Sequence, residues 1–162
     1  MTHDLLEDTV NIVQPVAFKV SCTNLGRSVA FYELLGYSKA GEASAIDGDW
    51  IGDLYGVHGA WPRVQMMTLG DDPRGVRLEL LQWSRQGTRV EGPNAAGAGA
   101  IGLRTKDIRA DLAILKEKGV VIVSEIVSRV SSAGELLVVT LRDPDGLSIQ
   151  LIQFVKLDSA GA

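Results

Sequence analysis

The chain has 162 residues, a length typical of one domain, which is enough to bury a core without disulfide bonds or structural metals. Its composition, 46% hydrophobic and 22% charged, excludes a disordered or fibrous chain, and no apolar run approaches the ~18 residues that a membrane span needs. The net charge of −4 offers no positive field to a phosphate backbone, so we expect neither a nucleic-acid nor a membrane partner.

Side chains that bind metals strongly are scarce. The single cysteine, Cys22, excludes an intrachain disulfide bond and any cysteine-rich zinc site, and we expect it to be a small buried apolar residue. Two histidines, His3 and His58, are available for a metal site or for histidine-based catalysis. The acidic segment 1–8 does not resemble a signal peptide, and together with the cysteine usage it predicts a cytoplasmic location.

The first half of the chain begins with a strand and a helix. Residues 16–21 alternate in polarity, as a half-buried strand does. Asn24 is a suitable N-cap for a helix with apolar residues at helical spacing, and Gly36 is placed to end that helix. A second strand is expected at 37–45. The long connection 46–62 is rich in aromatic residues, and we expect it to be functional.

A hairpin follows this connection. Its first strand is predicted at 64–69, and Asp-Pro-Arg-Gly at 72–75 predicts the turn, since proline presets one φ angle and glycine permits a positive one. The strand after the turn is expected at 76–83. Residues 86–98, which are rich in glycine, alanine and proline, predict a linker.

The second half repeats the first. At a shift of about 83 residues, the strand, cap and stop recur as 100–104, Asp107 and Gly119. At a shift of about 71 residues, the turn 72–75 and the strand after it recur as Asp-Pro-Asp-Gly at 143–146 and the run to Phe154. The remaining strands of this half are predicted at 120–127 and 136–141.

Each half therefore reads as one strand, one helix and about three further strands. Two βαβββ modules, at about 14–85 and 99–156, predict a single α+β domain over 1–162. We expect a curved mixed sheet that encloses one cup-shaped cavity, with the helices on the outside.

This pattern resembles the vicinal oxygen chelate superfamily, which includes glyoxalase I, methylmalonyl-CoA epimerase, extradiol dioxygenases and bleomycin-resistance proteins. The resemblance covers residues 16–154. It rests on Asn-Leu-Gly-Arg-Ser-Val-Ala-Phe-Tyr at 24–32 before Leu35 and Gly36, Leu-Glu-Leu at 78–80, and Asp-Pro-Asp-Gly at 143–146 before Ile-Gln-Leu at 149–151. The motifs point to the fold rather than to one reaction, because one fold hosts many functions. The resemblance also implies a homodimer, and leaves open whether the cup lies within one chain or is shared by two.

Metal-dependent relatives place a ligand on the first and last strand of each module. Carried onto this chain, these positions are Ala17, Glu79, Ala100 and Gln150. Both expected histidines are alanines, and oxygen ligands without imidazole suit zinc, nickel or iron poorly. The resemblance therefore implies a member without a metal or other cofactor. The alternative is a metal-dependent glyoxalase-like lyase or dioxygenase that uses Glu79, Gln150 and His58.

Alternate strand positions are expected to line the cup. Glu79 is the candidate acid-base group, with Lys19 or Arg104 stabilising an oxyanion, and Arg104 is the better match for a substrate carboxylate. The alternative is a structural ion pair that involves Glu79. His58 is a further candidate acid or base, or else a surface loop residue. The candidate substrate-binding residues are Gln150, Ser148, Trp50, Tyr55, Trp61, Trp83 and Ile152.

Two classes of function follow. The first is a metal-independent isomerase, epimerase, cyclase or lyase that transfers a proton on a small oxygenated, partly apolar substrate. The second is a non-catalytic antibiotic- or metabolite-binding protein of the bleomycin-resistance kind. The ligands of those relatives are cationic, whereas Lys19 and Arg104 favour an anionic or neutral ligand.

Overall fold

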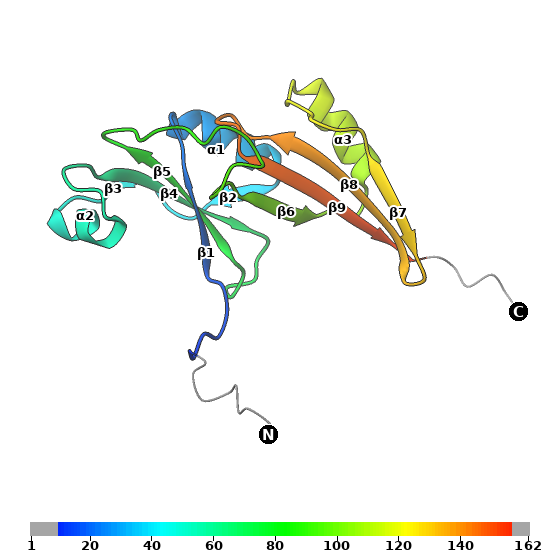
Figure 1. The fold of residues 1–162 in the computed structure, drawn as a ribbon, viewed down its shortest axis with the longest axis horizontal. Helices are drawn as coiled ribbons and strands as arrows, with labels where there is room; N and C mark the ends of the chain where they lie inside the picture. The colour runs from blue at the N-terminus through cyan, green and yellow to red at the C-terminus, as the bar shows by residue number, and fades with distance from the viewer. Residues whose placement is uncertain (1–9, 157–162) are drawn as a thin grey trace, which may run out of the picture.

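The computed structural model describes residues 10–156, so His3 and the segment 1–8 lie outside the described residues. Figure 1 shows a strand, a helix and further strands in each half, as the repeat predicts, with one additional helix in the first half. The first half contains β1 (Ala17–Ser21), α1 (Leu25–Leu34), β2 (Tyr37–Lys39), β3 (Ser44–Ala45), α2 (Asp49–Tyr55), β4 (Pro62–Leu69) and β5 (Arg77–Trp83). The second half contains β6 (Ala100–Arg104), α3 (Ile108–Glu117), β7 (Val127–Ser131), β8 (Gly134–Arg142) and β9 (Ser148–Val155).

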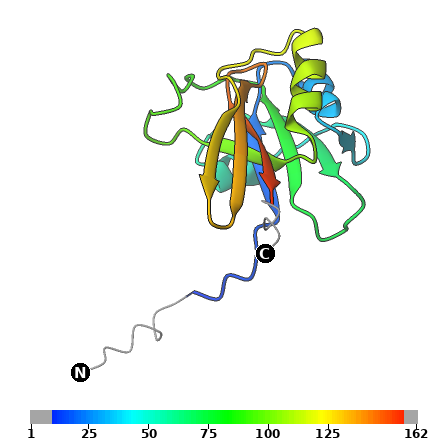
Figure 2. The same cartoon turned by 90° about the vertical axis from the view of Figure 1, so that its right-hand side faces the viewer.

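The strands form two mixed sheets with the same topology. The first sheet has the order β1-β5-β4-β2, with β3 paired to β4, and the second has the order β6-β9-β8-β7. In each sheet the first strand runs parallel to the last one, and the other neighbours are antiparallel. The predicted mixed α+β class is confirmed. Figure 2 turns the second sheet toward the viewer, with α3 along one side of it.

The two long helices begin and end where the sequence predicts. The side chain of Asn24 accepts a hydrogen bond from the backbone N–H of Arg27 at 2.9 Å, and Asp107 caps α3 in the same way. Gly36 and Gly119 follow the last helical turns with φ angles of 94° and 73°. Glycine adopts this left-handed region without strain, which explains why both helices stop there.

A second cap ties each helix to the last strand of its own module. The side-chain oxygen of Gln82 accepts from the N–H of Leu25 at 2.6 Å, and that of Gln153 accepts from the N–H of Ile108 at 2.9 Å. Both contacts satisfy a backbone donor that the first helical turn leaves free. The repeat therefore extends to hydrogen bonds between residues far apart in the sequence.

The core lies between the sheets and the two helices. Helix α1 packs on β4 and β5, helix α3 packs on β8 and β9, and both lie along the same edge of the molecule in Figure 1. Leu78 and Leu80 point into this core from β5, as do Ile149 and Leu151 from β9. Because side chains alternate along a strand, the residues between them point to the opposite side, which we call the open face of each sheet.

Three segments differ from their predicted form. Gly41, with a φ angle of 81°, separates the single strand expected at 37–45 into β2 and β3. The long connection 46–62 contains α2, which buries Ile51 and ends at the left-handed Gly56. The strand expected at 120–127 is replaced by β7, while residues 121–123 bond to the far end of β8. Both 120–127 and 127–131 contain apolar residues, so the sequence does not show which of the two pairs with β8 as a hairpin.

Gly134 begins β8 in a conformation that only glycine adopts readily. Its φ angle is 135°, and a Cβ atom there would lie 2.5 Å from the carbonyl oxygen of Val155. We expect Gly134→Ala to lower the free energy of unfolding by about 1–3 kcal/mol, because the left-handed strain adds to the clash. Urea unfolding measures this change, and Gly87→Ala is the control, since its Cβ would meet nothing within 4 Å. Equal stability of the two variants would contradict the prediction.

Within residues 10–156, no helix is long and apolar enough to cross a membrane.

Candidate functional site

The open face of the first sheet carries an ion pair. Lys19 and Glu79 are direct partners on the parallel strands β1 and β5, and the Lys19 ammonium donates a hydrogen bond to Glu79 Oε2. The Glu79 side chain is 14% exposed, against 48% for Lys19. The hydrogen bond to Glu79 raises the pKa of Lys19, although burial lowers it, and the nearby phenol of Tyr55 raises it further. Of the predicted catalytic residues, the structure therefore brings these two together.

Aromatic residues close one end of this face. Helix α2 places Tyr55 edge-on against Trp83, with ring centroids 5.1 Å apart and an interplanar angle of 84°. Trp83 lies four residues beyond Glu79 on β5, so it shares the open face, and its indole N–H donates to Ser21 Oγ at 3.0 Å. Two predicted substrate-binding residues thus adjoin the Lys19–Glu79 pair.

The other residues of the long connection lie elsewhere. His58 and Trp61 line a separate pocket of about 530 Å³ together with Asp47, Asp49 and Asp53. His58 Nδ1 lies 3.6 Å from Asp53 Oδ1, and both side chains are about three-quarters exposed. Trp50 is 55% exposed, and Trp61 is 48% exposed. The structure does not bring His58 to Glu79.

The open face of the second sheet carries a pocket of about 400 Å³. Its lining includes two predicted residues, the buried Ser148 and the half-buried Gln150. Across the ladder, Thr140 pairs with Gln150, and Arg142 pairs with Ser148. Gln150 Nε2 donates to Thr140 Oγ1 at 3.5 Å, and Arg142 Nη1 donates to Ser148 Oγ at 2.5 Å.

Thr140 and Arg142 are not among the predicted site residues, although the sequence contains a signal for them. The turn at 143–146 fixes the register of the two strands that it joins. Residues opposite Gln150 and Ser148 must therefore share their face, and these are Thr140 and Arg142. Two other predicted residues, Ile152 and Arg104, do not line this pocket. They pair with each other on β9 and β6, and Arg104 is exposed.

The two open faces belong to two separate sheets of the described chain. Within residues 10–156, no strand of one sheet pairs with a strand of the other, and β1 and β6 each have one unpaired edge. The pocket on the second sheet is lined by that sheet, by 123–124 and by the linker, without any residue of the first sheet. Met66, the neighbour of Glu79 on β4, is 39% exposed. The residues expected to line the cup are therefore divided between the two sheets.

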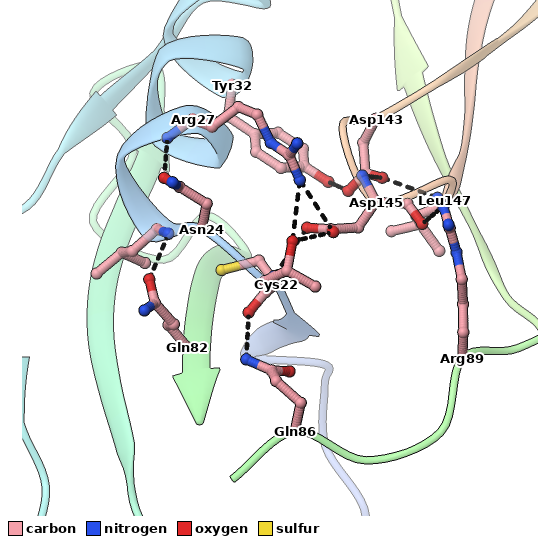
Figure 3. A network of polar contacts seen from close by, with 12 residues as sticks. Cys22, Asn24, Arg27, Tyr32, Gln82, Gln86, Arg89, Asp143, Asp145 and Leu147 are labelled. Atoms are coloured by element: carbon pink, nitrogen blue, oxygen red, sulfur yellow. Dashed lines mark hydrogen bonds and ion pairs between the residues drawn. The ribbon is translucent and has the colours of Figure 1, made fainter. Parts of the chain in front are cut away.

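A buried polar contact joins the two sheets on the helix side, and we call it the inter-sheet clamp (Figure 3). Asp143 is 4% exposed and accepts hydrogen bonds from the Tyr32 hydroxyl at 3.1 Å and from the N–H groups of Asp145 and Leu147. Burial, followed by the nearby Asp143, raises the pKa of Tyr32. The turn 143–146 therefore does more than reverse the chain, since Asp143 also connects the second sheet to α1 through Tyr32.

A second acid of the same turn completes the clamp. The Asp145 carboxylate accepts from the backbone N–H and the hydroxyl of Thr23 at 3.0 and 2.6 Å, and from Arg27 at 3.2 Å. From the linker, Arg89 donates to the Asp145 carbonyl at 2.6 Å. No such role was predicted for these residues from the sequence.

The four positions implied for a metal do not form a metal site. Ala17 and Ala100 offer no side-chain donor, Glu79 is paired with Lys19, and Gln150 is bonded to Thr140. Nor do residues 10–156 contain any group of three or more His, Cys, Asp or Glu that could hold a metal ion. These residues do not fit a divalent metal centre.

Comparisons with known proteins agree with the fold. The family model described as "Glyoxalase/Bleomycin resistance protein/Dioxygenase superfamily" matches residues 13–151. A glyoxalase family protein from Bacillus cereus is 20% identical and has a TM-score of 0.71, with 93% of this chain and 99% of that chain covered. No curated protein sequence matches the chain.

Two further solved structures illustrate the range of proteins with this fold. A trypanothione-dependent glyoxalase I from Leishmania major is 18% identical, with a TM-score of 0.56 and coverage of 88% of this chain and 87% of that one. TnmS3, an antibiotic-binding protein from Streptomyces, is 23% identical, with a TM-score of 0.55 and coverage of 91% and 100%. At these identities the likeness extends to the fold alone.

Proposed function

Because the chain belongs to the glyoxalase/bleomycin resistance protein/dioxygenase superfamily, we propose that it is a metal-independent enzyme that transfers a proton on a small oxygenated, partly apolar substrate. The resemblance of the sequence to this superfamily is confirmed by the family model. The observation that carries the proposed reaction is the Lys19–Glu79 pair on the open face of the first sheet. A carboxylate and a cation side by side can serve as a base and as a stabiliser of the negative charge that the base creates.

In the proposed reaction, Glu79 takes a proton from a carbon next to a carbonyl group. The C–H bond breaks, its electron pair moves to the carbonyl oxygen as an enolate, and the proton passes to a carboxylate oxygen of Glu79. Protonation removes the charge that holds Lys19, whose ammonium then stabilises the enolate oxygen. Return of the proton to another position or face gives isomerisation or epimerisation, and loss of a neighbouring leaving group gives elimination.

Hydrogen exchange with solvent tests this reaction before the natural substrate is known. The protein is incubated in D₂O with a panel of hydroxyketones and 3-oxoacids, and the loss of individual C–H signals is followed by NMR. Enzyme-dependent exchange at a carbon next to a carbonyl group supports the proposal. A panel member that binds but keeps all of its protons contradicts proton transfer on that compound and favours the alternative below.

The alternative function is binding without chemistry. It is favoured by the edge-on Tyr55–Trp83 pair, which offers aromatic surface beside the ion pair, and by the fold shared with the antibiotic-binding TnmS3. In this case the Lys19–Glu79 pair recognises polar groups of the ligand. Recovery of a tightly bound compound unchanged after long incubation would distinguish binding from catalysis.

We propose further that the working form is a homodimer in which each cup combines the two halves from different chains. The open faces of one chain share no strand pairing, and the free edges of β1 and β6 can each pair with another strand. A second copy would bring the Gln150 pocket of one chain over the Lys19–Glu79 pair of the other. Symmetric pairing of two copies would then produce two equal cups.

A mixing experiment tests the shared cup. We expect Glu79→Gln and Gln150→Ala each to lower exchange activity, because each damages one half of every cup. Coexpressed chains should recover about a quarter of the wild-type sites, since half of randomly paired dimers are mixed and each mixed dimer has one intact cup. Exchange activity of the purified mixture, together with its native mass, measures this recovery. A dimer without recovery would place each cup within one chain.

A further inference from the structure

The pocket on the second sheet contains a cation that no carboxylate among residues 10–156 neutralises. Arg142 is half-buried, and its Nη1 donates to Ser148 Oγ at 2.5 Å and to the Gly146 carbonyl at 3.2 Å. In the described part of the chain, its Nε and Nη2 have no hydrogen-bond partner, and the guanidinium forms no ion pair. A partly desolvated charge of this kind is stabilised by an anion.

The other two cations predicted to line the cup, Lys19 and Arg104, are not partly buried charges that lack an anionic partner. Lys19 is neutralised by Glu79, and the exposed Arg104 does not line the pocket. Arg142 is also held in place, because its Nη1 donates both to the Gly146 carbonyl of the turn and to Ser148 Oγ at the start of β9. Its Nε and Nη2 form an edge whose spacing matches the two oxygens of a carboxylate.

The remaining lining suits a short organic acid. Thr140, Ser124 and Gln150 add hydroxyl and amide groups beside Arg142, while Val123 and the alanines at 98 and 100 add small apolar surfaces. One guanidinium matches a single negative charge better than it matches a phosphate dianion, which proteins usually hold with several cations or backbone N–H groups. A volume of about 400 Å³ leaves room for a few carbons next to the charged group.

We infer that the Arg142 pocket binds a carboxylate group of the substrate, so that the reaction takes place on a small organic acid. This inference rests on the proposed function for the identity of the bound molecule as a substrate, whereas binding of a carboxylate at Arg142 does not depend on catalysis. In the shared cup the carboxylate lies on the second sheet of one chain, and the reacting C–H group faces Glu79 of the other. The substrate is therefore an oxoacid, in which the reacting C–H group lies next to the keto group and the carboxylate does not react.

Binding is tested on the full-length ¹⁵N-labelled protein with isobutyrate as the probe. Isobutyrate should shift the Nε–Hε signal of Arg142, identified by its absence in Arg142→Gln, with saturation at concentrations on the order of millimolar. The uncharged isobutyramide has nearly the same shape and should leave the signal in place. Inorganic phosphate serves as the third ligand and should bind more weakly than isobutyrate.

Variants separate the charge from its geometry. Arg142→Gln should weaken isobutyrate binding at least about tenfold, since the charge and the two-pronged donor are both lost. Arg129→Gln, which removes an exposed charge on β7 outside the pocket, should bind as the wild type does. If Arg142→Gln fails to fold, Arg142→Lys keeps the charge without the fork, and its binding should also weaken.

Several results would overturn the inference: equal binding of isobutyrate and isobutyramide, unchanged binding in a folded Arg142 variant, or tighter binding of phosphate. The proposed function is contradicted by different results from those that would contradict the carboxylate pocket. A Glu79→Gln protein that binds isobutyrate normally but loses exchange activity supports both ideas. A Glu79→Gln protein that keeps full exchange activity contradicts the acid-base role of Glu79 and leaves the carboxylate pocket intact.

Discussion

Replacing Glu79 with Gln is expected to lower proton exchange by about 10²–10⁴-fold, because the substitution removes the proposed base while keeping the size of the side chain. The fold should be preserved, since the pair lies on the open face, where Lys19 is half exposed, and ion pairs of this kind contribute little to stability. The measurement is deuterium exchange into a panel compound that the wild-type protein labels, alongside thermal unfolding.

Two further variants, a control and a variant of the partner lysine, help to interpret the result. Glu33→Gln removes an exposed carboxylate on α1, far from the open face, and should exchange protons like the wild type. Lys19→Gln should lower the rate by about 10²–10³-fold if its ammonium stabilises the enolate oxygen. Full activity of Glu79→Gln would assign the Lys19–Glu79 pair a purely structural role, the second interpretation that the sequence allows.

Loss of Asp143 is expected to have the largest effect on stability. Asp143→Ala should lower the free energy of unfolding by about 2–4 kcal/mol, because it leaves the buried Tyr32 hydroxyl and two backbone N–H groups without their acceptor. Asp72 occupies the equivalent place in the first turn but is exposed, so Asp72→Ala should cost less than about 1 kcal/mol. Urea unfolding compares the two variants, and equal losses would show that the clamp does not stabilise the fold.

The clamp should also make stability depend on alkaline pH. The pKa of Tyr32 is raised in the folded protein, so between the ordinary value of 10.0 and the folded value the native state holds a proton that the unfolded state has lost. Stability should therefore fall as the pH rises above 10, by up to about 1.4 kcal/mol per pH unit. Tyr32→Phe removes this contribution. Burial also raises the pKa values of Tyr37 and Cys22, but these residues are present in both the wild-type and the Tyr32→Phe protein. The difference in unfolding free energy between the two proteins, measured by urea unfolding across this pH range, therefore reports on Tyr32.

Local rules predicted the parts of the fold that depend on near neighbours. Asn24 and Asp107 cap their helices, and Gly36 and Gly119 end them, because these effects need only a few adjacent residues. The repeat placed Glu79 and Gln150 on equivalent last strands, and the alternation of each strand turned both toward the open faces.

Other features depend on how distant segments pack. Asp143 reads as an ordinary turn residue, and only the position of α1 beneath it converts that turn into the inter-sheet clamp. The pocket that holds His58 likewise depends on α2, a seven-residue helix too short to show a helical period. Arg142 was predictable in principle, because the register of its hairpin follows from the turn.

The paired glutamine caps suggest how such a fold changes its chemistry over time. Gln82 and Gln153 anchor the helices on the core side of their sheets, together with the apolar residues that hold each module together. Positions 17 and 100, which are alanines here, lie on the opposite side, where another side chain would not enter that framework. Stability and specificity are thus encoded by different faces of the same strands, so the ligand can change without rebuilding the interior.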